Sequence, residues 1–277
     1  MLKQRIMTAL VLLAIIVPAI TGAPPWVWGL ISLLMLSIAG HEWGRLLGSR
    51  LGSWLLCAAL GVCGAIYLLW RSTSGVGALP GAVAFLSAAS VVFWLSVGLI
   101  SLVRGRPIGS GWANGLLVLS ACWVALFELR LLGAAMLVSA MAIVWVADIG
   151  AYFAGRAFGR HKLAPHISPG KTWEGVAGGV AAVLALSLAV VLFAPQANGS
   201  VFSSRLVTDL GWTLSAAILM ALACLSVAGD LYESLLKRRA GVKDSGALLP
   251  GHGGVLDRID ALIPTMPGCL LLMELLR

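Results

Sequence analysis

Charged residues are scarce in this chain. Only 11% of its 277 residues are Asp, Glu, Lys or Arg, whereas 60% are hydrophobic and the mean hydropathy is +0.99. A soluble domain usually carries about 25% charged residues, so this scarcity excludes a soluble globular fold. Apolar stretches long enough to cross a hydrocarbon core of about 30 Å occur throughout the chain. They predict nine spans, at about residues 6–21, 26–40, 51–70, 79–103, 112–128, 133–154, 174–194, 211–236 and 255–275.

Strand signals and cysteine motifs are also lacking. Alternation of apolar and polar residues is rare, and Gly and Ala are abundant in the apolar stretches. Helices satisfy their own backbone hydrogen bonds in lipid and pack closely through small residues. The predicted fold class is therefore all-α, a polytopic transmembrane helical bundle. The five cysteines all lie in apolar stretches without CxxC spacing, which argues against a disulfide framework or a cysteine metal site.

Lys and Arg are unevenly distributed between the two sides of these spans. If the N-terminus is cytoplasmic, 15 of the 19 lie on the cytoplasmic side, as the positive-inside rule requires. We therefore expect a multi-pass protein of the cell inner (plasma) membrane, with loops 155–173 and 237–254 in the cytoplasm. Residues 1–23 resemble a signal peptide, but no soluble domain follows, so we interpret them as an uncleaved first helix.

The charges that are present divide the chain into two parts. Residues 1–130 form N-terminal transmembrane helices that carry little functional information. Residues 131–277 form the expected catalytic region, where segments 148–174 and 230–260 hold 16 of the chain's 30 formal charges. Charge concentrated on two cytoplasmic loops predicts a single site. In the first part we interpret His41, Glu42 and Arg45 as interfacial residues.

Acidic residues near the cytoplasmic ends of two spans predict a cation site. Asp230, Glu233, Ser234 and Lys237 share one face of the eighth helix because of their spacing. Asp230 follows an apolar run and needs a partner, for which a divalent cation is the simplest choice. Glu233 is instead expected to pair with Lys237, four residues later.

The start of the last span adds Asp257 and Asp260, which are spaced to share a face. Carboxylates from two helices, completed by triphosphate oxygens and water, are a common arrangement for Mg²⁺. One of these two acids could alternatively serve as a helix cap that complements the helix dipole. Together with Asp230 they exceed what capping requires.

A glycine-rich loop, PGHGG at residues 250–254, lies between these acids. Such a loop before a helix allows backbone N–H groups to approach an anion. Lys237, Arg238 and Lys243 add donors for phosphate. A solvated basic loop that attracts anionic lipid is the alternative interpretation.

The second charged loop carries a further set of polar residues. Asp148, Tyr152 and Gly155 are spaced to share a face of the sixth helix. The following GKT resembles a P-loop, but Pro165 stands where that motif needs glycine, and no strand is predicted before it. Lys171 remains a candidate phosphate donor, and Ser168 or Thr172 a candidate N-cap of the seventh helix.

The charged segment from Ser234 to Asp260 resembles the signature of the phosphatidate cytidylyltransferases, or CDP-diacylglycerol synthases, of bacterial type. The agreement covers Ser234, Leu236, Lys237, Arg238, Lys243, Asp244, Gly246, Leu249, Pro250, His252, Gly253, Gly254, Asp257, Arg258 and Asp260. The stretch SPGKTWEG at 168–175 also resembles these enzymes. Before about residue 130 the likeness extends only to size, hydropathy and number of spans.

This resemblance implies that CTP and phosphatidic acid are converted to CDP-diacylglycerol and pyrophosphate, with Mg²⁺ required and a monovalent cation such as K⁺ as a further candidate. It implies metal ligation by Asp230 and Asp257, with Asp260 shared or nearby. It implies catalytic roles for Asp230, Asp257, Lys237, Arg238, Lys243 and Asp244. It implies substrate binding by Ser168, Lys171, Thr172, His252, Gly253, Gly254 and Arg258.

Other functions remain open at this point. A lipid kinase that uses CTP could carry similar loops. A transporter would spread its charges over several spans or show inverted repeats, and a CDP-alcohol phosphotransferase would need an acidic helical motif that is absent here. The membrane bilayer is an expected partner and nucleic acid is not. A homodimer is compatible with the sequence.

Overall fold

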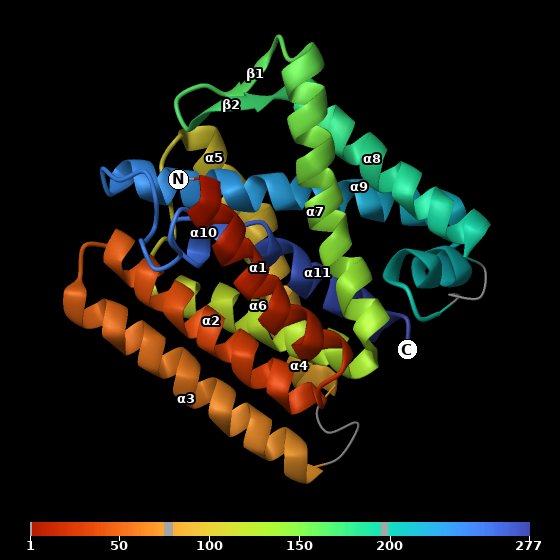
Figure 1. The fold of residues 1–277 in the computed structure, drawn as a ribbon, viewed down its shortest axis with the longest axis horizontal. Coiled ribbons are helices and arrows are strands. Elements are labelled where there is room, and N and C mark those ends of the chain that lie inside the picture. Colours follow the sequence, from red (N-terminus) through yellow and green to blue (C-terminus); the bar gives the residue numbers. More distant parts are fainter. Residues whose placement is uncertain (1, 75–79, 195–198) are drawn as a thin grey trace.

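The computed structural model describes residues 2–74, 80–194 and 199–277, and it is built almost entirely of helices (Figure 1). The all-α fold class is therefore confirmed. In chain order the elements are α1 (Leu2–Thr21), α2 (Pro25–Leu46), α3 (Arg50–Ser74), α4 (Pro80–Phe93), the π-helical turn η1 (Trp94–Gly98), α5 (Leu99–Arg104), α6 (Trp112–Leu132), α7 (Ala134–Phe158), β1 (Lys162–Ala164), β2 (Ser168–Thr172), α8 (Trp173–Phe193), α9 (Phe202–Arg239), α10 (Leu256–Ile259) and α11 (Leu262–Leu275).

Seven helical segments among the described residues are long and apolar enough to cross a membrane, compared with about nine predicted. These are α1, α3, the continuous run Gly81–Arg104, α6, α7, α8 and α9. The other two predicted spans are helical but differ in character. Helix α2 carries His41, Glu42 and Arg45 near its end, which shortens its apolar stretch. The last predicted span is divided into α10 and the 14-residue α11, and the predicted boundary at 79 lies outside the described residues.

Helix α9 is bent at a glycine. Gly211 has φ +75° and ψ 166°, a non-helical conformation inside the 38-residue element. Glycine adopts positive φ without the Cβ clash that other residues meet. The portion after Gly211 begins where the sequence predicted the span, and it carries Asp230, Glu233 and Lys237.

Helices α7 and α8 pack against each other through small residues. A Cβ on Gly178 would approach the Ala154 Cβ to 2.1 Å, and one on Gly179 would approach the Ala147 carbonyl oxygen to 2.6 Å. Small residues allow close backbone approach in membrane helices. The antiparallel hairpin β1–β2, seen at the top of Figure 1, connects the two helices. The sequence predicted only a loop there, because strands of three and five residues carry too little alternation to recognise.

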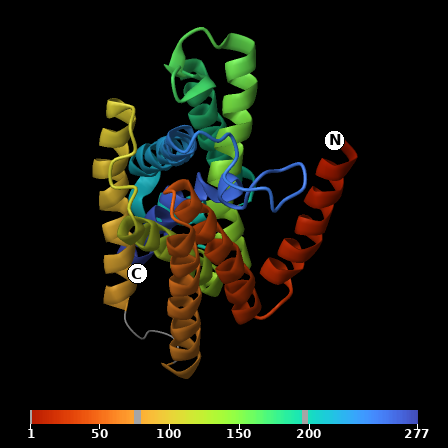
Figure 2. The same ribbon diagram turned by 90° about the vertical axis from the view of Figure 1, so that its left-hand side faces the viewer.

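Helix α1 lies at one side of the bundle, and the segment between α9 and α10 extends toward it (Figure 2). The Thr8 hydroxyl donates to the carbonyl oxygen of Pro250 at 3.0 Å. Gly251 has φ +76°, and a Cβ there would lie 2.9 Å from Cγ of Arg5. The first helix thus supports the glycine-rich loop near the other end of the chain.

Candidate active site

A cavity of about 490 Å³ lies between α7, β2, the start of α8 and α9. Asp148, Tyr152 and Gly155 line it from α7, so the helical face predicted from their spacing is confirmed. Across the cavity Asp230 contributes from α9. The remaining lining residues are Ala151, Arg156, Ser168, Gly170, Lys171, Thr172, Gly175, Val176 and Val227.

The hairpin positions a lysine opposite the acid of α9. Nζ of Lys171 lies 2.8 Å from Oδ2 of Asp230, and both side chains are partly exposed. Thr172 ends β2 and caps α8, because its hydroxyl accepts a hydrogen bond from the Gly175 N–H at 3.1 Å. This confirms Thr172 rather than Ser168 as the N-cap. The cap places the preceding lysine at the mouth of the cavity.

A second group of contacts surrounds Lys237 on the next turns of α9. Lys237 forms the predicted ion pair with Glu233 and also donates to Oδ1 of Asp257 at 2.7 Å. Ser234 donates to Oδ1 of Asp230 at 3.4 Å. The face predicted for this helix is therefore present, and Lys237 extends it to α10.

Asp257 anchors the glycine-rich loop. Its Oδ2 accepts from the Ser245 N–H and hydroxyl, both at 3.0 Å, and from the Gly254 N–H at 2.8 Å. Burial raises the pKa of Asp257, but the hydrogen bonds from Lys237 and Gly254 outweigh this effect and hold the pKa at about 2. Asp257 is therefore an anion at neutral pH, and its Oδ1 retains a lone pair beyond the Lys237 bond.

Asp260 differs from Asp257 in its surroundings. Burial and the nearby negative charge of Asp230 raise its pKa. Its Oδ1 accepts a hydrogen bond from the Ala261 N–H at 2.8 Å. A cation placed between Asp230 and Asp260 would relieve this repulsion.

The loop 250–254 is shaped by glycines that leave room for carboxylates. Gly253 has φ +84°, and a Cβ there would lie 2.8 Å from Oδ2 of Asp257. The loop closes through the Leu249 N–H, which donates to the Gly253 carbonyl oxygen at 3.0 Å. These glycines therefore permit the loop to wrap around the anchoring acid.

The remaining predicted phosphate ligands do not line the cavity: Arg258 contacts the loop 250–254, and Arg238 contacts the turn of the β1–β2 hairpin. Nε of Arg258 donates to the His252 carbonyl oxygen at 2.9 Å, and Nε of Arg238 donates to the Ile167 carbonyl oxygen at 3.3 Å. Lys243 and Asp244 are exposed. Their roles toward substrate stay predictions.

Glu42 is a member of this region that sequence reasoning missed. It is buried on α2, and its carboxylate accepts from the Leu256 N–H at 2.7 Å, the Val255 N–H at 3.2 Å and the Ser245 hydroxyl at 3.2 Å. A Cβ on Gly246 would lie 2.2 Å from its Oε1. A charged residue at a span end looks interfacial in sequence, and only its partners more than 200 residues later reveal this role.

In the described part of the chain, no three His, Cys, Asp or Glu side chains lie close enough together to form a complete metal site. The acidic side chains of this region are nevertheless of the type that binds cations. Asp230 lies near enough to Asp148 and Asp260 for their charges to interact, and Glu233 is similarly affected by Asp260. Hard oxygen ligands of this kind suit Mg²⁺. Five carboxylates thus share this region with Lys171, Lys237 and Arg156, and a bound cation would reduce the repulsion between neighbouring acids. The five are Asp148, Asp230, Glu233, Asp257 and Asp260.

Comparison with known proteins gives one consistent result. Residues 3–276 match the model of the cytidylyltransferase family. A Pseudomonas aeruginosa protein named phosphatidate cytidylyltransferase is 39% identical, over 96% of this chain and 95% of that protein. A Haemophilus influenzae protein of the same name is 37% identical over 96% of both chains. A third, from Brucella suis, is 38% identical over 95% of this chain and 89% of its own.

Proposed function

This chain belongs to the cytidylyltransferase family, and from that premise we propose that it is an integral membrane enzyme converting CTP and phosphatidic acid to CDP-diacylglycerol and pyrophosphate. The observation that carries the proposal is the juxtaposition of two features. One is the cavity in which Lys171 meets Asp230. The other is the glycine-rich loop that Asp257 holds, and Asp257 is bonded to Lys237 on the same helix as Asp230.

In this reaction the protein has to position the two substrates rather than form bonds with them. A phosphate oxygen of phosphatidate attacks the α-phosphorus of CTP, a new P–O bond forms, and the bond to the β-phosphate breaks to release pyrophosphate. Phosphatidate is already anionic, so no general base is needed. Catalysis then depends on holding the reactants in line and neutralising charge.

The residues divide these tasks. Lys171, Lys237 and Lys243 provide positive charge for phosphate oxygens. In the loop 250–254 the backbone N–H groups of Gly251 and Gly253 are the ones that can face the same anion, because Pro250 has no N–H and the N–H groups of His252 and Gly254 already donate to the Leu249 carbonyl oxygen and to Asp257. A divalent cation such as Mg²⁺, held by Asp230, Asp260 and the remaining lone pair of Asp257, would neutralise triphosphate charge when bound. A monovalent cation such as K⁺ belongs to the same proposal.

The orientation of the site follows from the substrate. The chain carries membrane-spanning helices, and CTP is available in the cytoplasm, so we place the β1–β2 hairpin and the 240–254 segment there. His166 and Ala247 are exposed in these segments. In a background without the native cysteines, His166→Cys and Ala247→Cys should react with an impermeant thiol reagent only after the membrane is opened. Labelling of intact cells would contradict this orientation.

The reaction itself is tested with purified protein, phosphatidate, Mg²⁺ and CTP labelled at either the α- or the γ-phosphate. The proposal predicts that the α-label enters the lipid and the γ-label leaves in pyrophosphate. Transfer of the γ-label to lipid would instead identify a CTP-dependent lipid kinase.

A further inference from the structure

A second polar cavity, of about 480 Å³, lies at the junction of α2 and α3, and it shares no lining residue with the cavity of about 490 Å³ between α7, β2, α8 and α9. Its lining is basic and polar, with His41 and Arg45 from α2 and Arg50 and Trp54 from α3. Gly48, Ser49 and Ser53 complete it. It contains no acidic lining residue, which favours an anionic occupant.

The charged groups of this cavity are available to a ligand. Arg45 and Arg50 are exposed and form no ion pair with any described acidic residue. Nδ1 of His41 is buried and has no hydrogen-bond partner among the described residues. Its ring contacts Trp54, with 4.3 Å between ring centroids. Two guanidinium groups beside an unsatisfied imidazole nitrogen form a suitable site for a phosphate group.

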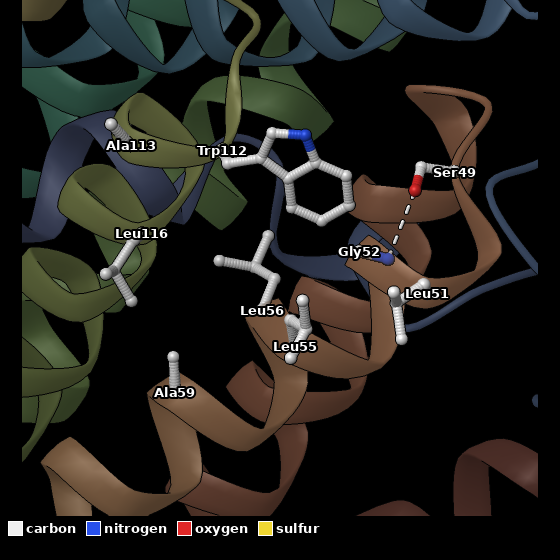
Figure 3. Close-up of a pocket in the computed structure, with 9 residues that line it drawn as sticks. All are labelled: Ser49, Leu51, Gly52, Leu55, Leu56, Ala59, Trp112, Ala113 and Leu116. Atoms are coloured by element: carbon white, nitrogen blue, oxygen red, sulfur yellow. Dashed lines mark hydrogen bonds between the residues drawn. The ribbon is translucent and has the colours of Figure 1, made fainter.

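An apolar groove of about 530 Å³ adjoins this cavity between α3 and α6 (Figure 3). Figure 3 shows Trp112 lying between the start of α6 and the leucines of α3. The indole packs on Gly52, where a Cβ would come within 1.9 Å of the ring. Leu51 and Leu55 are 72% and 60% exposed, so the groove opens to the bilayer. Ser49 lines both the groove and the basic cavity and is the point where they meet.

We propose that this junction binds an anionic phospholipid, with its phosphate on Arg45, Arg50 and His41 and an acyl chain in the groove under Trp112. Basic pockets between transmembrane helices are suited to anionic headgroups, and exposed apolar grooves to lipid chains. The site goes beyond the proposed reaction, because the candidate catalytic cavity is formed by α7, β2, α8 and α9 instead. Phosphatidylglycerol, which is anionic but not the proposed substrate, is the appropriate probe.

The test uses p-benzoylphenylalanine as a photo-crosslinker in the full-length protein, reconstituted in nanodiscs. Leu55→p-benzoylphenylalanine should crosslink phosphatidylglycerol at least fivefold more than phosphatidylcholine. The matched control is Leu69, which is 68% exposed on the same helix, about 21 Å further along at 1.5 Å per residue. Crosslinking from Leu69 should not distinguish the two lipids.

The headgroup contacts are tested in the Leu55 crosslinking background. Arg45→Ala/Arg50→Ala should reduce crosslinking of phosphatidylglycerol to the level of phosphatidylcholine, while Arg45→Lys/Arg50→Lys should retain most of the preference. Arg104→Ala/Arg106→Ala, which removes the same charge from exposed positions elsewhere, should leave it unchanged.

Three results would contradict the proposed phospholipid site. One is equal crosslinking of the two lipids from Leu55. Another is a preference that survives in a folded Arg45→Ala/Arg50→Ala protein. The third is complete loss of the preference in millimolar glycerol phosphate, which would indicate a site for free anions. If the Arg45→Ala/Arg50→Ala variant does not fold, the proposal is still tested by comparing crosslinking of phosphatidylglycerol and phosphatidylcholine in the protein that retains both arginines. None of these readouts requires CTP turnover, so they remain informative if the proposed reaction is wrong.

Discussion

Replacing Glu42 should damage CTP use even though this residue lies on α2, far in sequence from the charged loops. Its carboxylate holds both ends of the segment that contains residues 250–254, through Ser245 on one side and Val255 and Leu256 on the other. We expect Glu42→Ala to loosen this loop and to affect the use of phosphatidate less than the use of CTP. Glu42 is thus a positioning residue rather than a catalytic one.

The size of the expected effect follows from the hydrogen-bond donors that Glu42→Ala leaves without an acceptor. The Ser245 hydroxyl keeps its bond to Asp257, whereas the N–H groups of Val255 and Leu256, both in buried residues, lose theirs. An unsatisfied buried donor costs about 1–3 kcal/mol, so the ordered loop should lose about 4 kcal/mol. Local relaxation and water will recover part of this. At 1.36 kcal/mol per tenfold change in rate, a fall in kcat/KM for CTP of at least about 10²-fold is expected.

The assay measures kcat and KM for CTP and phosphatidate separately in purified variants. Glu42→Ala should raise the KM for CTP far more than that for phosphatidate. Glu42→Gln keeps an oxygen for the Leu256 N–H and should recover to within about tenfold of wild type, because only the Val255 bond is lost. Glu274→Ala, which removes a partly buried acid at the other end of the chain, serves as the control. Equal effects on both substrates, or no recovery in Glu42→Gln, would refute a positioning role.

Three further predictions concern the site and the bundle. Asp230→Asn should lower the rate of CDP-diacylglycerol formation by at least about 10³-fold at ordinary Mg²⁺ without changing the melting temperature, because a cation ligand is lost; full activity would refute ligation by this residue. Lys243→Ala should raise the CTP requirement more than the phosphatidate requirement in initial-rate measurements, and equal increases would indicate a structural role. Glu128→Ala should destabilise the protein by about 3 kcal/mol in a reversible unfolding assay, because this buried carboxylate accepts from Arg71 and Tyr67; replacing both Glu128 and Arg71 with apolar residues should restore most of the loss.

The features predicted correctly from sequence are those set within one element. Hydropathy located the helices, and helical spacing predicted the contacts within α9 that the structure contains, Asp230 with Ser234 and Glu233 with Lys237. The cap was narrowed to Ser168 or Thr172 because capping depends on neighbours three residues away, and the structure selects Thr172. Local rules of this kind need no knowledge of which helix lies opposite.

Features that depend on two distant elements could not be predicted. Nothing in the spacing of the loop 148–174 indicated that Lys171 would face Asp230. The polar end of α2 likewise gave no sign of its partners, because a charged residue at a span end usually serves only the interface. Periodicity identifies which side chains share a face, but tertiary packing decides what that face meets.

The position of Glu42 also explains Gly246, which the anion-binding interpretation did not cover, and gives a second reason for glycine at position 254. A Cβ on Gly246 would lie 2.2 Å from its carboxylate, and one on Gly254 would lie 2.6 Å from it and 2.2 Å from the Ser245 hydroxyl. These positions therefore accommodate a buried acid from α2, in addition to any anion on the loop's other side. The loop has a protein carboxylate behind it, and its remaining N–H groups are the ones available to phosphate. Helix α2 belongs to the part of the chain whose sequence carries little functional information, and its Glu42 supports the loop on the side opposite the proposed anion.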